Sequence, residues 1–233
     1  MKERHNNVLE EHLERYKLAS KFVKNLKVLD AACGAGYGTK MLELAGAAAV
    51  TGIDISEESL KNARETYFGD SITFEYGDVN QLTIPSESFD VVVSFETIEH
   101  IDVGSKWIEE SSRVLKEGGI FIVSTPNRDI TNPGSYHEEQ PLNIFHKYEY
   151  NTNEFIGELL MKYDIIELYG QTFINDKDIP YTNIMRQLRK KDVNYIPKNT
   201  RKVTDHGLIP LGEIKNSQPM YLVAVCRKKI NMS

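Results

Sequence analysis

Apolar residues in the chain recur with two different spacings, which together predict helices alternating with strands. The first spacing is three or four residues, as on one face of an amphipathic helix, and near the start it holds Leu9, Leu13, Tyr16, Ala19 and Val23. The second is a short, nearly continuous apolar run, typical of a buried strand. Such runs occupy 27–32, 49–55, 72–79, 89–95, 119–126, 164–173 and 220–228. Further helices are expected over 38–46, from Glu57 onward, and over 107–115 and 152–163.

Two helix starts carry recognisable capping residues. Ser56 precedes Glu57 and Glu58, so its hydroxyl can cap the next helix while the two acids stabilise the first turn. Asn151 followed by Glu154 has the spacing of a capping box. Both signals agree with the apolar spacing and support the predicted helix boundaries.

The predicted strands are too continuously apolar to have a solvated face. This favours an α/β fold in which helices cover both faces of a mostly parallel sheet, and right-handed crossovers make that sheet doubly wound. Residues 1–26 are expected to form an N-terminal cap helix, and residues 27–173 with 220–233 form the core. Two long connections interrupt the pattern: a lid-like loop at 127–150 and an insertion at 174–219.

The bulk properties exclude several classes of protein. The 233 residues suit one domain, and a net charge of -6 disfavours a general nucleic-acid binder, which is usually basic. Cys33 and Cys226 are too isolated to form a disulfide framework or a zinc site. The charged N-terminus lacks a signal peptide, and no apolar run approaches the roughly 18 residues of a membrane span. We therefore expect a cytoplasmic protein.

A glycine-rich turn follows the first predicted strand. Gly34, Gly36 and Gly38 follow Asp30 in the stretch VLDAACGAGYG, with the first glycine four positions after the acid. Glycines there let a ligand approach the backbone, as in dinucleotide-binding turns. A carboxylate beside a pyrophosphate would repel it, whereas a carboxylate beside a cation is favourable. Asp30 therefore favours a positively charged ligand, acting on it directly or through the turn that it organises.

Two further acids define the ligand more closely. Asp54 ends the second strand, where a carboxylate can accept both hydroxyls of a ribose, and Asp78 follows the third strand, where it can accept from the amine of adenine. Ribose, adenine and a cationic amino-acid tail together describe S-adenosylmethionine.

The sequence at this point resembles the class I S-adenosylmethionine-dependent methyltransferases. The similar stretches, in the family's order, are VLDAACGAGYG, VTGIDIS, YGDVNQLTIPSESFDVVVSFETIEHI and RVLKEGGIFIVSTP. The resemblance covers roughly residues 27–127 and implies a Rossmann-like, seven-stranded sheet, with LYGQTF and YLVAVCRK as an antiparallel pair at its edge. It implies that the residues in contact with the cofactor are Arg15, Tyr16, Asp30, Gly34, Gly36, Asp54, Ile55, Asp78, Val79 and Phe95.

The acceptor is less well defined. No DPPY or NPPY follows the fourth strand, which argues against methylation of nucleobase amines. The stretches HLERYKLA, FETIEH and NIFHKYEY resemble enzymes that accompany surface-polysaccharide glycosyltransferases. We therefore expect O-methylation of a sugar, nucleotide sugar or glycan. A quinone, phenol or amine is the alternative acceptor, and a non-catalytic cofactor-binding module is a second alternative.

Two histidines are candidate general bases for an alcohol acceptor. His100 comes just past the strand whose tip faces the methyl group in the family, and His146 lies in the lid-like loop. Each can also be a purely structural histidine. If the segment is helical, Glu96, Glu99 and His100 share one face and can hold a divalent metal ion.

The insertion is strongly basic. Between Asn183 and Lys202 only Asp192 opposes its cations, which are Arg186, Arg189, Lys190, Lys191, Lys198, Arg201 and Lys202. They form either a solvated helix face or a patch for an anionic acceptor.

Overall fold

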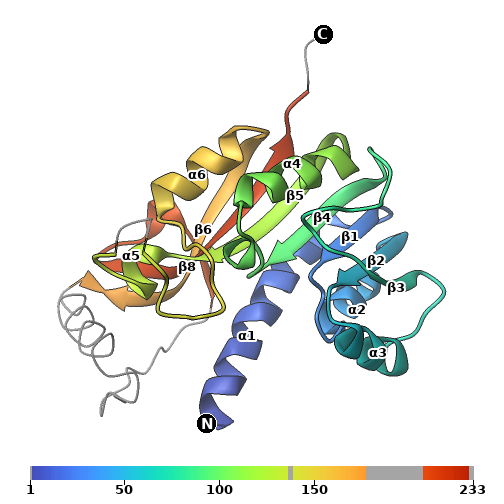
Figure 1. The fold of residues 1–233 in the computed structure, drawn as a ribbon, viewed down its shortest axis with the longest axis horizontal. Coiled ribbons are helices and arrows are strands. Elements are labelled where there is room, and N and C mark those ends of the chain that lie inside the picture. Colours follow the sequence, from blue (N-terminus) through green and yellow to red (C-terminus); the bar gives the residue numbers. More distant parts are fainter. Residues whose placement is uncertain (1, 136–138, 177–206, 231–233) are drawn as a thin grey trace.

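The computed structural model of the chain describes residues 2–135, 139–176 and 207–230, with side chains from residue 8 onward (Figure 1). Its single sheet has the strand order β3-β2-β1-β4-β5-β8-β6-β7. The strands are β1 Lys27–Ala31, β2 Ala49–Asp54, β3 Ile72–Tyr76, β4 Phe89–Phe95, β5 Leu115–Pro126, β6 Tyr163–Asn175, β7 Leu208–Pro210 and β8 Ser217–Lys228. The helices are α1 Lys2–Ala19, α2 Tyr37–Leu44, α3 Glu57–Thr66, α4 Gly104–Val114, α5 Arg128–Thr131 and α6 Thr152–Leu160, with the 3₁₀ turns η1 Ser20–Phe22, η2 Ile98–His100 and η4 Leu211–Glu213.

The expected doubly wound α/β architecture is confirmed. Strands β1 to β5 pair in parallel, and β8 runs antiparallel between β5 and β6. The sheet has one strand more than the seven expected. The additional strand, β7, is three residues long and pairs antiparallel with β6. It lies inside the segment expected to be an insertion, and it is too short to show an alternating pattern.

Each face of the sheet supports its own core, which explains the continuous apolar runs. Along β4, Val91 and Val93 pack with α1 and α2, whereas Val92 packs with Trp107 of α4 and Phe155 of α6. Figure 1 shows the same layers, with α4 and α6 on one side of the sheet and α1, α2 and α3 on the other. Every residue in the middle of β4 is therefore buried, whichever face it points to.

The predicted helix caps are present. The Ser56 hydroxyl accepts from the backbone N–H of Ser59 at 3.2 Å and begins α3. Asn151 and Glu154 form both hydrogen bonds of a capping box and begin α6. No helix in the described part of the chain is both long and apolar enough to cross a bilayer.

The two long connections differ in how much of them the structure describes. Asn127 and Tyr150 form a β-bridge, so the two ends of the lid-like loop lie together, and α5 occupies its first residues. Residues 177–206 lie outside the described residues. This range contains all seven cations of the predicted basic patch, whose roles remain predictions.

Candidate functional site

The glycine-rich turn connects β1 to α2 and leaves open space at one position. The backbone has positive φ at Ala32 (61°), Gly34 (53°) and Gly36 (82°). A Cβ on Gly36 would lie 2.7 Å from the Cβ of Ala63, so this glycine allows α3 to pack. A Cβ on Gly34 would meet no atom within 4 Å. Gly34 is therefore the glycine that a ligand can approach.

The N-terminal helix packs directly on this turn. A Cβ at Gly38 would lie 1.9 Å from Cζ of Tyr16, so the tyrosine ring fits only against a glycine. The Tyr16 hydroxyl donates to Asp30 at 2.9 Å, and the Thr39 hydroxyl donates to the other oxygen of Asp30 at 2.6 Å. Asp30 is only 1% exposed, and burial raises its pKa to about 6. The structure thus places Asp30 beneath the turn, joining β1, α1 and α2.

The other two predicted acids lie along the same edge of the sheet. The two oxygens of Asp54 accept from the backbone N–H groups of Gly34 and Ser56, each at 2.8 Å. Asp78 accepts from the backbone and side-chain amides of Asn80. Each carboxylate oxygen can accept more than one hydrogen bond, so both acids can still accept from a ligand. Asp54 also shapes the turn, because it holds Gly34 in place.

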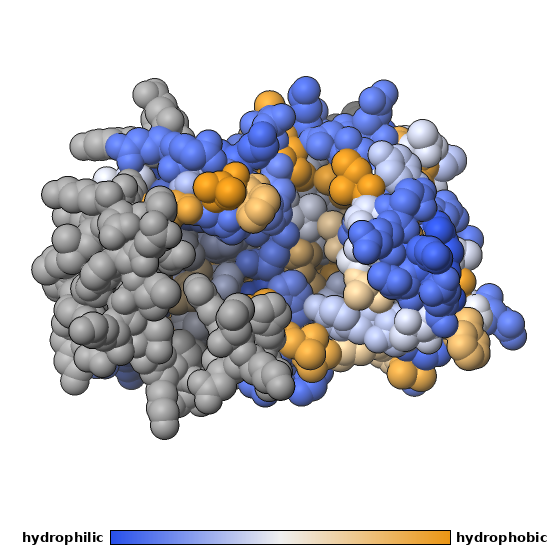
Figure 2. Space-filling model, turned by 60° about the horizontal axis from the view of Figure 1, so that its bottom comes forward, coloured by the Kyte–Doolittle hydropathy of each residue, from blue (hydrophilic) through white to orange (hydrophobic). Residues whose placement is uncertain are grey.

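The remaining cofactor candidates supply an apolar border. Ile55 follows β2 and is 64% exposed, and Val79 is partly buried against the core. Phe95 ends β4 beneath the surface, with its ring centroid 5.0 Å from that of Tyr16. The face toward which the parallel strands end is hollowed near its centre (Figure 2).

Arg15 of α1 forms a buried ion pair at the end of β4. Its Nη1 lies 3.0 Å from Oε1 of Glu96, and its Nε donates to Gln171 at 2.7 Å. The guanidinium is fully buried, yet its Nη2 has no hydrogen-bond partner among the described residues. Glu96 itself has a positive φ of 50°. An unsatisfied buried donor beside a strained residue indicates a place for a ligand.

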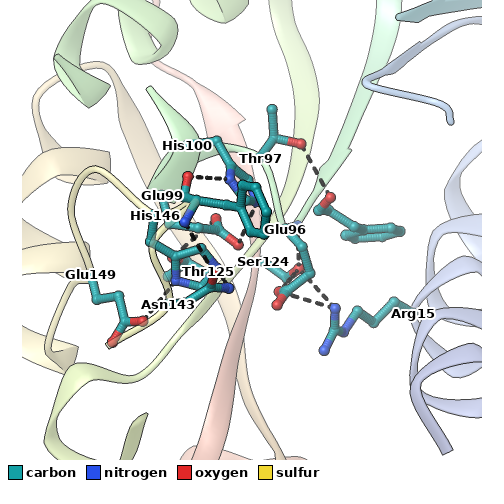
Figure 3. A network of polar contacts seen from close by, with 12 residues as sticks. Arg15, Glu96, Thr97, Glu99, His100, Ser124, Thr125, Asn143, His146 and Glu149 are labelled. Carbon is teal, nitrogen blue, oxygen red and sulfur yellow. Dashed lines mark hydrogen bonds and ion pairs between the residues drawn. The ribbon is translucent and has the colours of Figure 1, made fainter. Parts of the chain in front are cut away.

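A second cluster lies next to this ion pair (Figure 3). Glu99, His100 and His146 offer potential ligand atoms that all lie within 4.8 Å of one another. The two imidazole rings pack edge to face, with centroids 4.9 Å apart. Burial, together with the nearby negative charge of Glu96, holds the pKa of Glu99 well above its usual range. The Glu99 carboxyl therefore binds its proton more tightly than an exposed glutamate does.

The two histidines differ in their hydrogen bonds. His100 is 42% exposed at its side chain, and its Nδ1 lies 2.9 Å from the carbonyl oxygen of Phe145. His146 is buried, with Nδ1 2.7 Å from Glu149 and Nε2 2.7 Å from the side-chain amide of Asn143. The structure thus brings both predicted histidines together, but only His100 has a ring nitrogen without a hydrogen bond among the described residues.

The metal set considered from sequence needs one correction. Glu96, Glu99 and His100 were to share a helix face, but the helical segment is a single 3₁₀ turn, Ile98–His100. Glu96 precedes this turn, and its left-handed backbone directs its side chain to Arg15. His146 stands near Glu99 and His100 instead.

Several polar residues of this site were missed from the sequence. Burial and the charge of Arg15 lower the pKa of His12 to about 4, so His12 is neutral. Thr172 has a φ of 58°, which is rare for a β-branched residue, and donates to Glu11 at 2.7 Å. Glu11 and Arg15 are four residues apart, a spacing that indicates a polar stripe on α1. The partner in β6 has no sequence signal of its own.

Comparisons with known proteins agree with this geometry. A family model described as a methyltransferase domain matches residues 29–123. The "probable S-adenosylmethionine-dependent methyltransferase" of Mycolicibacterium smegmatis is 40% identical over 133 residues, which cover 57% of this chain and 49% of that protein. The ubiquinone biosynthesis O-methyltransferase of Proteus mirabilis is 32% identical over 182 residues, covering 73% and 72%.

Solved structures share the fold over nearly the whole chain. An S-adenosylmethionine-dependent methyltransferase from Mesorhizobium loti superposes with a TM-score of 0.61 and 19% identity, covering 89% of this chain and 93% of that one. The chain spans about half the length of the mycobacterial relatives that it matches. The match to the Proteus protein extends over most of both chains, and the family model matches the part that holds the glycine-rich turn. This chain therefore belongs to the class I S-adenosylmethionine-dependent methyltransferases.

Proposed function

We propose that this chain transfers a methyl group from S-adenosylmethionine to a hydroxyl of a sugar, nucleotide sugar or glycan. The observation that carries the proposal is the meeting of three segments that are distant in sequence: 12–19, 95–100 and 143–150. Arg15 pairs with Glu96, the backbone of Lys147 donates to the Glu99 carbonyl, and His100 contacts Phe145. These are the same three segments that resemble enzymes accompanying surface-polysaccharide glycosyltransferases.

The described residues fit the family's cofactor. Gly34 borders open space, Asp54 can accept further hydrogen bonds, and Nη2 of Arg15 is a buried donor that a ligand carboxylate would satisfy. S-adenosylmethionine supplies a methyl group on a positively charged sulfur. The chain's task is then to align the acceptor oxygen and exclude water.

His100 is suited to take the acceptor's proton. Its Nδ1–H donates to the Phe145 carbonyl, so the lone pair is on Nε2, in a side chain that is partly exposed. A hydroxyl that gives its proton to Nε2 becomes the nucleophile, and its new bond to the methyl carbon would form as the bond between that carbon and the sulfur breaks, which leaves the sulfur uncharged. Nε2 lies 4.0 Å from Oε1 of Glu99, beyond hydrogen-bonding distance, so it remains open to a hydroxyl of the acceptor.

A phenol or quinone is the second acceptor class. It is favoured by the Proteus mirabilis relative, whose name describes a ubiquinone biosynthesis O-methyltransferase. Ile144 and Phe145 are 77% and 71% exposed beside His100, and such side chains can contact a flat ring. A sugar ring also has an apolar face, so this contact suits both classes.

Metal assistance is a second candidate mechanism. Glu99, His100 and His146 lie close enough to share a divalent ion, which would acidify a bound hydroxyl. To bind, an ion would need Glu99 ionised and one nitrogen of His146 released from its present partner.

A labelled-methyl transfer assay tests the proposed function. Purified protein is incubated with methyl-labelled S-adenosylmethionine and a panel of nucleotide sugars, glycans, phenols and amines. Label on a sugar oxygen is the expected result. Label on a phenol would support the second acceptor class, and cofactor binding without transfer to any acceptor class would favour a non-catalytic module.

A further inference from the structure

We propose that Asn143 is a positioning residue that sets the proton position on both histidines of the site. Its side chain lies between the backbone of Phe145 and the ring of His146. Through these contacts, Nε2 of His100 is the one ring nitrogen of the two histidines that has no hydrogen bond among the described residues. The inference rests on the proposed function, because it explains why His100 rather than His146 is the base.

The orientation of the Asn143 amide follows from its neighbours. The backbone N–H of Phe145 donates to Oδ1 of Asn143 at 3.1 Å, so the oxygen must lie on that side. The amide nitrogen Nδ2 then faces Nε2 of His146 at 2.7 Å. An amide nitrogen only donates, and Nε2 must therefore accept with its lone pair.

The proton of His146 is consequently on Nδ1. That nitrogen donates to Oε1 of Glu149 at 2.7 Å, and the other oxygen of Glu149 accepts from the Thr131 hydroxyl at 2.5 Å. Glu149 is 3% exposed at its side chain, so water does not compete for this contact. Both nitrogens of His146 are committed, and its ring is unavailable as a base while Asn143 stays in place.

The same amide acts on His100 through the backbone. Asn143 holds the peptides on both sides of Phe145: its side chain accepts from the N–H of Phe145, and its backbone carbonyl accepts from the N–H of His146 at 3.0 Å. The second of these peptides carries the Phe145 carbonyl, which accepts from Nδ1 of His100. The proton of His100 is thereby placed on Nδ1, which is not the nitrogen that an exposed histidine favours in water. Its Nε2 keeps the lone pair that general-base catalysis needs.

The loop has other anchors, so a substitution at Asn143 should not unfold it. The Glu99 carbonyl accepts from the backbone N–H groups of Lys147 at 2.7 Å and Tyr148 at 3.1 Å. Gln140 donates to the His146 carbonyl at 2.8 Å. Asn143 itself is exposed. Its replacement therefore removes two hydrogen bonds without removing core packing.

Ring-nitrogen NMR tests the proposal without needing turnover. In ¹⁵N-labelled protein, His100 and His146 are assigned by comparison with His100→Gln and His146→Gln. We expect both residues as the Nδ1–H form in the parent. In Asn143→Leu, which is nearly isosteric but apolar, His100 should shift toward the Nε2–H form. Asn153→Leu, at an exposed asparagine on α6, is the matched control and should change neither histidine.

Kinetics supply the second readout. Asn143→Leu should lower kcat about fivefold or more, because the loss of one hydrogen bond can change the tautomer population by that factor. The affinity for the cofactor should stay unchanged. Asn143→Ala, which removes the side chain, should act in the same direction. An Nε2–H form of His100 in the parent, or unchanged tautomers in Asn143→Leu, would overturn the proposal. If no acceptor is methylated, the NMR result still decides the role of Asn143 while the proposed function fails separately.

Discussion

The hydroxyl of Tyr16 donates a hydrogen bond to Oδ1 of Asp30 over 2.9 Å, and this contact attaches α1 to the first strand. The second oxygen of Asp30 accepts from Thr39 of α2. The acid that precedes the glycine-rich turn is therefore a junction of three elements, and its charge lies under the turn. Its influence on a cationic ligand passes through the turn that it holds.

This burial predicts an unusual pH dependence. The pKa of Asp30 is raised from 3.8 to about 6, so the folded state binds the proton more tightly than the unfolded chain. Ionisation therefore costs stability as pH rises through about 4 to 6, on the order of 3 kcal/mol when complete. Asp30→Asn removes this cost. Its free energy of unfolding relative to the parent should increase between pH 4 and 7, as measured by urea denaturation.

His12 provides the contrast for that measurement. Its pKa is lowered to about 4, so the unfolded chain binds the proton more tightly, and the parent gains stability as pH rises from about 4 to 6.5. His12→Gln should therefore lose stability relative to the parent over the same range in which Asp30→Asn gains it. Parallel pH profiles for the two variants would show that the assigned burial of these groups is wrong.

The sheet was predictable from sequence because its strands are buried on both faces. The run Val91, Val92 and Val93 is apolar throughout, because Val92 packs in the core on one face of the sheet and its two neighbours pack in the core on the other face. The caps at Ser56 and Asn151 are local, so a few neighbouring residues suffice to identify them. β7 was missed because three residues carry no periodicity.

The site was predictable only where each residue follows a strand. Asp54 is the last residue of β2 and Asp78 lies two residues past the end of β3, and parallel strands end at one edge. The partners of Arg15 illustrate the limit. Gln171 is 156 positions away, and the left-handed backbone of Glu96 turns its side chain away from His100 toward α1. Neither fact is contained in a local pattern.

Two glycine substitutions separate packing from ligand approach. Gly38→Ala places a methyl group 1.9 Å from the Tyr16 ring and should destabilise the fold by roughly 3 kcal/mol or more. The methyl group of Gly34→Ala would have no atom within 4 Å, so only the positive φ of 53° disfavours the substitution, and it should lower stability by about 1–2 kcal/mol. Gly34→Ala should instead weaken cofactor binding. Thermal unfolding and calorimetric titration distinguish the two, and equal destabilisation by both would contradict the assigned roles.

Asp54 should contribute directly to cofactor affinity. Asp54→Ala removes both an acceptor for ligand hydroxyls and the contact that holds Gly34 at 2.8 Å. We expect binding of S-adenosylmethionine to weaken by about 1–3 kcal/mol in isothermal titration calorimetry. Glu58→Ala, which removes an exposed acid from the start of α3, is the control for loss of charge and should bind normally. Normal affinity in a folded Asp54→Ala protein would sink the assignment.

Chelation tests metal assistance. Both ring nitrogens of His146 are hydrogen-bonded, and the pKa of Glu99 is held well above its usual range by burial, so this arrangement disfavours a bound cation. We expect methyl transfer to persist after treatment with EDTA and removal of the chelator. Loss of transfer that added Mg²⁺ restores would instead assign Glu99, His100 and His146 as ligands. Glu99→Gln should then abolish the restoration.

The rate of a single turnover in His100→Gln decides whether His100 is the general base. The substitution keeps a polar side chain but removes the basic nitrogen, and His100 is not among the predicted cofactor contacts. With an acceptor identified from the panel, we expect methyl transfer to slow by roughly 10²–10⁴-fold while the Kd for S-adenosylmethionine is unchanged. A single-turnover rate equal to that of the parent protein would contradict this role of His100.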